Sequence, residues 1–205
     1  MRFILLVFSY LLLSCSNSID STKIVQIKQY NGFPKQELDT VVSTIESFYK
    51  VKVDVLKNQE LYASSFINVK SPRYRADSII KFQKREINDT IDFILGLTHR
   101  DISTTKTDKS GKTNEPKYKY QDWGIMGLAY CPGNSCIIST FRIKTKDEKQ
   151  YFSRLKKVSV HEFGHNLGLK HCNDKKCVMT DAVESVQTID NAELQLCEKC
   201  NSAIH

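Results

Sequence analysis

The residues best suited to chemistry lie in one short stretch, residues 161–171, with the sequence HEFGHNLGLKH. His161 and His165 are four residues apart, so on an α-helix of about 3.6 residues per turn they project from one face and can share a metal ion. His171 offers a third imidazole. Gly168 can turn the chain out of the helix toward that third ligand, because glycine adopts positive φ without a Cβ clash. Three neutral imidazoles in this arrangement predict a zinc site.

Glu162 follows the first of these histidines and is predicted to act as a general base instead of a ligand. Three protein ligands leave one tetrahedral position of zinc open to water, whose pKa then falls toward about 7. A carboxylate beside that water can accept its proton, which predicts metal-assisted hydrolysis of peptide bonds. The alternative for HExxH alone is a solvated helix, but three of the chain's five histidines lie in this stretch. His99 and His205 are assigned no role.

Four cysteines follow the histidines in two closely spaced pairs. Cys172 and Cys177 have C-x4-C spacing, and Cys197 and Cys200 have C-x2-C spacing. Such pairs suit a tetrahedral zinc site made of four thiolates. Two disulfides are the alternative, favoured in an oxidising compartment. A bridge between Cys197 and Cys200 would close a very tight ring, however, and longer-range bridges leave the short spacings unexplained.

The whole pattern, HExxHxxGxxHC-x4-C-x-M-x17-C-x2-C, resembles the archaemetzincin family of zinc metallopeptidases at every position. The resemblance firmly covers residues 158–200 and extends more loosely upstream through ILGLTHRDI and GIMGLAY. It implies that the three histidines bind a catalytic zinc, that Glu162 is the general base or acid, and that the four cysteines bind a second, structural zinc. It also implies that Met179 forms a methionine turn beneath the first metal, where a lone methionine would otherwise be interpreted as core filler.

The amino terminus, MRFILLVFSYLLLSC, combines one positive charge with a short apolar run and a final cysteine. The run is too short for a permanent membrane span and indicates a secretory signal. The residues before Cys15 resemble a bacterial lipobox, in which that cysteine is acylated and anchors the protein to the membrane. We therefore expect a signal peptide at 1–15, a tether at 16–22 and an exported, membrane-anchored lipoprotein of the bacterial cell envelope. An ordinary signal peptide with an incidental cysteine is the alternative.

Removal of that segment from the 205 residues leaves about 190, enough for one domain, expected at 23–205. The formal charge of +7 is spread along the chain. The one cluster of aromatic and basic residues, KYKYQDW, is interpreted as a solvent-exposed segment that leads into a strand. We expect a peptide or protein substrate, no nucleic-acid partner and a monomer. Residues 103–116 lack periodicity and are predicted to form an exposed loop.

Hydrophobic periodicity predicts an alternating order of strands and helices. Strands are expected at 23–29, 51–56 and 92–97, helices at 37–49, 75–87 and 149–167, and a β-hairpin at 123–130 and 136–143. This order predicts an α/β (α+β) fold with a mixed, mostly parallel twisted sheet of about five strands, packed by helices that include the zinc-binding one. The metzincin resemblance implies that the first hairpin strand is the antiparallel edge beside the cleft. An extended peptide could then pair with that edge.

Cys131 and Cys136 bracket the hairpin turn, and a disulfide between them is the first interpretation in an exported protein. A metal role and an inhibitory thiol directed at the catalytic zinc are the alternatives.

Three classes of function remain: a zinc peptidase, a zinc-binding envelope lipoprotein without turnover, and a lipoprotein that only binds a partner. The intact Glu162 and the open zinc position favour the peptidase. No tyrosine follows Met179 closely enough to be assigned as an oxyanion stabiliser.

Overall fold

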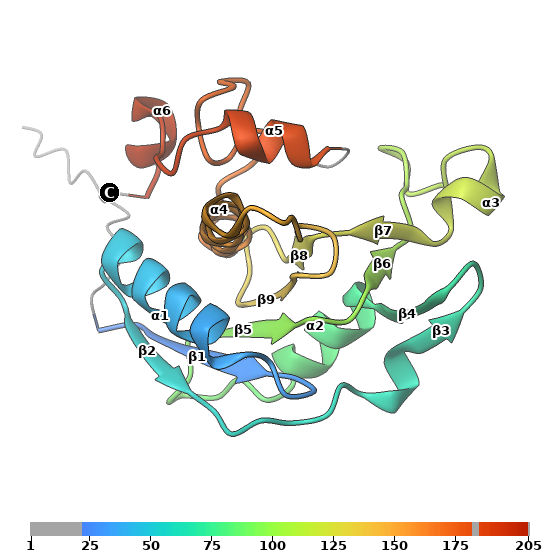
Figure 1. The fold of residues 1–205 in the computed structure, drawn as a ribbon, viewed down its shortest axis with the longest axis horizontal. Coiled ribbons are helices and arrows are strands. Elements are labelled where there is room, and N and C mark those ends of the chain that lie inside the picture. The colour runs from blue at the N-terminus through green and yellow to red at the C-terminus, as the bar shows by residue number, and fades with distance from the viewer. Residues whose placement is uncertain (1–21, 182–184, 205) are drawn as a thin grey trace, which may run out of the picture.

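The computed structural model describes residues 22–181 and 185–204 (Figure 1). The predicted signal peptide and Cys15 lie outside these described residues. Within them, no helix is both long and apolar enough to cross a bilayer.

The main sheet has five strands in the order β2-β1-β5-β9-β8. Three neighbouring pairs, β1 with β2, β1 with β5 and β5 with β9, are parallel, and β8 pairs antiparallel with β9 at the edge. The predicted sheet with its antiparallel edge strand is therefore confirmed. The strand bounds are Ile24–Gln29 for β1, Lys52–Val55 for β2, Phe93–Thr98 for β5, Gly127–Ala129 for β8 and Ser135–Ser139 for β9.

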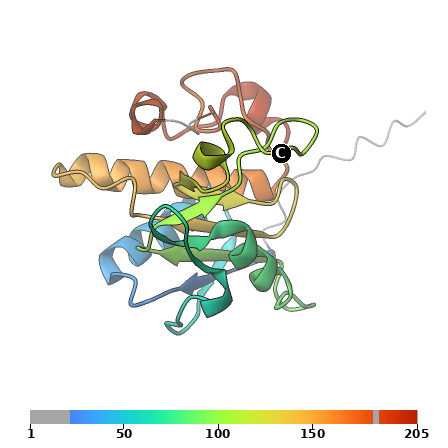
Figure 2. The same cartoon turned by 90° about the vertical axis from the view of Figure 1, so that its right-hand side faces the viewer.

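Helices cover both faces of this sheet, because its central strands bury side chains on both. Val25 and Ile27 of β1 pack in one core with helices α1 (Lys35–Tyr49) and α4 (Glu148–Asn166). Ile137 of β9 points the opposite way, into a second core with α2 (Ala76–Lys84). Asp147 caps α4 by accepting a hydrogen bond from the Gln150 N–H at 3.1 Å. Figure 2 shows α4 running across the molecule between the sheet and the C-terminal segments.

A second, four-stranded sheet was not predicted from the sequence. Its order is β3-β4-β6-β7, and its bounds are Phe66–Asn68, Pro72–Arg75, Ile102–Thr104 and Trp123–Ile125. The single strand predicted at 123–130 is wrong, because β7 pairs with β6 whereas β8 pairs with β9. The second hairpin strand ends at Ser139. The loop predicted at 103–116 begins in β6 and contains a bridge between Thr107 and Thr113.

The remaining elements are short. They are a 3-10 turn, η1 (Ala63–Ser65), and the helices α3 (Lys117–Tyr120), α5 (Val186–Asn191) and α6 (Glu198–Asn201). An ion pair joins α5 to α4, since the Arg154 guanidinium donates to both carboxylate oxygens of Asp190 at 2.7 and 2.6 Å. This ion pair holds α5 against the side of α4 that faces away from the main sheet (Figure 1).

Candidate active site and metal centres

Three imidazoles meet at the C-terminal half of α4. His161 and His165 lie on successive turns, and Gly168, with φ of 94°, reverses the chain after the helix so that His171 reaches the same point. One ring nitrogen of each histidine lies within 4.8 Å of the corresponding atoms of the others. The Nε2 atoms of His161 and His165 are 3.0 Å apart. The structure thus brings together the three histidines proposed from the sequence.

Backbone carbonyls fix the orientation of two of these rings. His161 Nδ1 lies 2.9 Å from the Val178 carbonyl oxygen, and His165 Nδ1 lies 2.6 Å from that of Leu169. Since a carbonyl only accepts, each Nδ1 carries the proton and each Nε2 keeps a lone pair for a metal. Burial lowers the pKa of His161 to about 3, and its neighbour His165 adds to the effect. Neutral, oriented imidazoles are the donor set that zinc prefers.

Met179 lies directly beneath these histidines. Its side chain is fully buried, and a Cβ atom built on Gly164 would approach its Sδ to 2.6 Å. Gly164 precedes His165, so the thioether packs against the helix where the ligands project. The Met179 carbonyl accepts from the Cys172 N–H at 2.8 Å, which ties this turn to the segment after His171. Met179 therefore packs against the helix that carries His161 and His165, and its role as a methionine turn stays a prediction.

Glu162 lies at the floor of a cleft of about 450 Å³ that the three histidines also line. Its residue exposure is only 8%, and burial raises the pKa of its carboxyl to about 8. β8 forms the facing wall, where Gly127 leaves room for the carboxyl: a Cβ atom there would lie 2.5 Å from Glu162 Oε1. The cleft therefore combines a metal-binding donor set, a buried carboxyl and a sheet edge.

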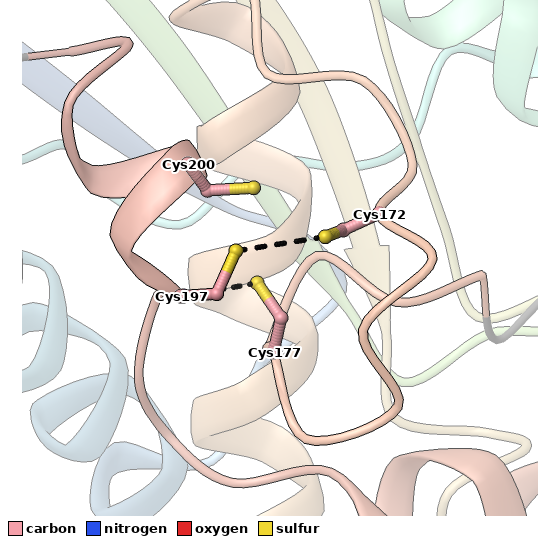
Figure 3. A group of neighbouring side chains, drawn as sticks. All are labelled: Cys172, Cys177, Cys197 and Cys200. Carbon is pink, nitrogen blue, oxygen red and sulfur yellow. Dashed lines mark hydrogen bonds between the residues drawn. The ribbon is translucent and has the colours of Figure 1, made fainter.

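The four C-terminal cysteines form a second cluster. Their sulfur atoms all lie within 4.8 Å of one another and point toward a common centre (Figure 3). The Sγ atoms of Cys172 and Cys197 are 3.6 Å apart, and the Cys197 N–H donates to Cys177 Sγ at 3.3 Å. All four are free thiols, not disulfides. Four converging thiols match a tetrahedral zinc site.

The disulfide predicted between Cys131 and Cys136 is wrong, since both are free. Cys136 lies in β9, whose alternation directs its side chain into the core beside α4. Cys131 lies at the surface and lines the cleft, where its thiol donates to the Leu169 carbonyl at 3.4 Å. The two side chains therefore point to different environments.

Sequence reasoning missed Lys157, which also lines the cleft. Its spacing of four residues before His161 was an available signal, because that spacing places both residues on one helix face. Ile189 and Ala192 were also missed, since only tertiary packing brings them to the cleft.

Comparison with known proteins gives consistent matches. A sequence model of peptidase family M54 matches residues 25–205. The archaemetzincin of Haloquadratum walsbyi is 28% identical over 191 residues, covering 89% of this chain and 99% of that protein. The archaemetzincin of Archaeoglobus fulgidus is 41% identical over 80 residues, covering 39% of this chain and 49% of that protein.

Two solved structures share the fold over most of the chain. The crystal structure of the archaemetzincin from Methanopyrus kandleri has a TM-score of 0.71 at 24% identity and covers 90% of this chain and 94% of that one. The Archaeoglobus fulgidus archaemetzincin, complexed with malonate, has a TM-score of 0.69 at 25% identity and covers 88% of this chain and 99% of that one.

Proposed function

Since this chain belongs to peptidase family M54 and is a zinc metallopeptidase, we propose that His161, His165 and His171 hold a catalytic zinc ion and that Glu162 moves protons during peptide hydrolysis. The observation that carries this proposal is the meeting of three imidazoles and a buried carboxyl in one cleft beside a sheet edge. The cluster of four thiols is proposed to hold a second, structural zinc that ties the chain after His171 to α6.

Glu162 supplies the proton transfers of this mechanism. When bound, zinc polarises the scissile carbonyl and lowers the pKa of water toward about 7. The Glu162 carboxylate accepts the proton of the attacking water and returns it to the leaving amine. A zinc cation held by the neighbouring imidazoles would favour the ionised form of Glu162 and so offset the effect of burial on its pKa. Gly127 allows the carboxyl to remain in the cleft while it does this.

Substrate is proposed to bind as an extended strand along β8. The Tyr130 N–H donates to the Ser135 carbonyl, and the Ser139 N–H donates to the Met126 carbonyl. Hydrogen-bonded and non-hydrogen-bonded pairs alternate along an antiparallel ladder. Leu128 lies two residues from both Met126 and Tyr130, so its backbone also forms hydrogen bonds with β9. Gly127 and Ala129, the residues in between, direct their backbone N–H and C=O groups outward to the cleft. Main-chain pairing at these two residues gives affinity with little demand on sequence.

A peptide digest tests the proposed activity. The purified, zinc-loaded protein is incubated with a mixed peptide library, and the products are identified by mass spectrometry. We expect new peptide termini that require zinc and that disappear when Glu162 is replaced by glutamine. A protein that contains zinc and leaves the library intact would contradict the proposal and instead support a zinc-binding protein without turnover.

We further propose that the protein is exported and anchored in the cell envelope by acylation of Cys15, as the lipobox-like sequence suggests. Expression in a bacterium should place the protein in the membrane fraction, and Cys15→Ser should release it. Mass spectrometry of the mature amino terminus should find an acylated Cys15. An unprocessed Met1 would contradict this proposal.

A further inference from the structure

Lys157 occupies a defined position in the cleft wall. It lies one helical turn before His161, about 6 Å along the axis of α4, on the same face. Its ammonium donates to the carbonyl oxygens of Ile189 at 3.0 Å and Asp190 at 3.3 Å, near the end of α5. An ammonium has three N–H donors. One therefore has no partner among the residues that the structure describes.

Asp190 and Glu193 attract the positive charge of Lys157, but among the described residues neither forms a salt bridge with it. The nearest carboxylate, Asp190, is engaged by the Arg154 guanidinium through both oxygens and by the Gln150 amide. Glu193 pairs with Lys176 at 3.3 Å. Of the side chains that line the cleft, Lys106, Lys157 and Lys170 are cationic, and the buried Glu162 is the one carboxyl in the described lining. Asp181 lies beside His171 at 3.6 Å, at the metal end of the cleft. The Lys157 end of the described lining thus offers a cation without a carboxylate in contact with it.

Apolar residues line the cleft together with Lys157. Val158, Ile189 and Ala192 are buried and line the same cleft. Partial burial lowers the pKa of the Lys157 ammonium. A charged partner in such surroundings is attracted more strongly than in water, because the local dielectric constant is lower. A side chain with methylene groups and a terminal carboxylate complements both the apolar wall and the cation.

The direction of β8 decides which part of a peptide meets Lys157. Gly127 faces Glu162, and the Tyr130 carbonyl accepts from the Asn166 amide at 3.0 Å, so β8 and α4 run in the same direction. A peptide antiparallel to β8 therefore runs toward the N-terminal part of α4. The residue directly after the scissile bond then lies beside the helix turn that carries Lys157.

We infer that Lys157 is a specificity-determining residue that selects substrates with a glutamate directly after the scissile bond. The inference rests on the proposed peptidase function and on strand pairing with β8. The recognised group is a carboxylate, which could also be the free C-terminus of a short peptide. The glutamate side chain is the favoured source, because a bound chain can continue along the cleft past Lys157 toward β7.

The test uses extended peptides that differ only at the residue after the scissile bond, which is Glu, Gln or Lys, each with an amidated C-terminus. A fourth peptide has Gln at that position and a free C-terminal carboxylate directly after it. We expect kcat/KM for the Glu peptide to exceed that for the Gln peptide by about tenfold. Lys157→Met should reduce this ratio to about one, and Lys157→Arg should retain the preference. Lys149→Met, an exposed lysine on the same helix, is the matched control and should leave the ratio unchanged.

Binding separates this inference from the proposed activity. Fluorescence anisotropy of the same labelled peptides is measured with the zinc-loaded Glu162→Gln protein, with and without Lys157→Met. Tenfold tighter binding of the Glu peptide, lost with Lys157→Met, supports the inference even if no peptide is cleaved, an outcome that would defeat only the peptidase proposal. Equal binding of Glu and Gln peptides, an unchanged preference in Lys157→Met, or a preference lost equally in Lys157→Arg would overturn it. Preference only for the free C-terminus would also overturn the assignment to a glutamate side chain.

Discussion

Gly127 and Glu162 are complementary in shape across the cleft: a Cβ atom on Gly127 would lie 2.5 Å from the Glu162 Cγ and Oε1 atoms. Real Cβ atoms do not approach other atoms so closely, so the carboxyl can hold its position only because residue 127 is glycine. The edge strand therefore shapes the position of the Glu162 carboxyl, which we propose as the general base.

Gly127→Ala is expected to displace the Glu162 carboxyl and to lower kcat by about 10²-fold, since small errors in the position of a catalytic group are costly. Zinc content, measured by elemental analysis, should not change. The control is a double-mutant cycle: in a Glu162→Gln background, Gly127→Ala should cause little further loss. Additive losses in the double variant would show that Gly127 acts independently of Glu162.

Glu162→Gln should retain the fold and the zinc content and reduce turnover by about 10²- to 10⁴-fold, because an amide cannot accept the proton of water. His165→Ala should differ by losing the catalytic metal itself. Steady-state kinetics together with zinc analysis distinguish the two effects. Full activity of Glu162→Gln at equal zinc content would refute the assigned role.

Chelation should remove the two proposed zinc ions one after the other, the histidine-bound zinc first. The His171 side chain is 40% exposed beside the open cleft, whereas Cys177 and Cys200 of the thiol cluster are buried. A mild chelator is expected to abolish activity and to remove about one zinc ion before circular dichroism changes. A total of one zinc per chain, with the four cysteines found in disulfides by mass spectrometry, would contradict the prediction.

Ala129→Pro should raise KM for extended peptides, because proline removes an outward-facing N–H that is proposed to pair with substrate. Leu128→Pro should instead destabilise the fold, since the backbone of Leu128 pairs with Ile137 in β9. Gly127→Pro would combine lost pairing with a clash against Glu162, so Ala129 is the cleaner site. Kinetics and thermal unfolding are measured for each variant. An unchanged kcat/KM in the folded Ala129→Pro protein would exclude docking along this edge.

The ion pair between Arg154 and Asp190 should make the free energy of unfolding depend on pH in the acid range. Hydrogen bonding to the guanidinium lowers the pKa of Asp190. The pair therefore contributes fully above the unfolded pKa of about 3.9, and this stability is lost as the pH falls through the lower, folded pKa. At neutral pH, Asp190→Asn should cost about 2 kcal/mol, because the buried Arg154 guanidinium loses its counter-ion, although it keeps its hydrogen bond to the Ile143 carbonyl and Asp190 is partly exposed.

Chemical denaturation at several pH values measures this effect, with Asp39→Asn as the control. Asp39 forms an exposed pair with Lys35, and the loss of such a pair costs about 0.5 kcal/mol or less. Equal destabilisation by the two substitutions, or an acid dependence unchanged in Asp190→Asn, would argue against the proposed contribution of the pair between Arg154 and Asp190.

The sequence alone indicated the grouping of the histidines, because helical periodicity is local: residues four apart share a face whatever surrounds the helix. The five-stranded sheet was predictable for a similar reason, since its buried strands are short apolar runs between helices. The short spacings of the cysteines indicated their convergence. The roles of these residues in binding zinc remain predictions that the metal analyses above will test.

Tertiary structure decided the features that depend on partners distant in sequence. The stretch 123–130 looks like one strand, but β7 and β8 separate because their hydrogen-bonding partners lie in different sheets. Cys131 and Cys136 are near in sequence, yet the orientation of β9 directs them apart. The approach of Lys157 to Ile189 depends on how α5 docks on α4. Strand pairing and packing are chosen by the whole chain, so no local pattern of residues determines them.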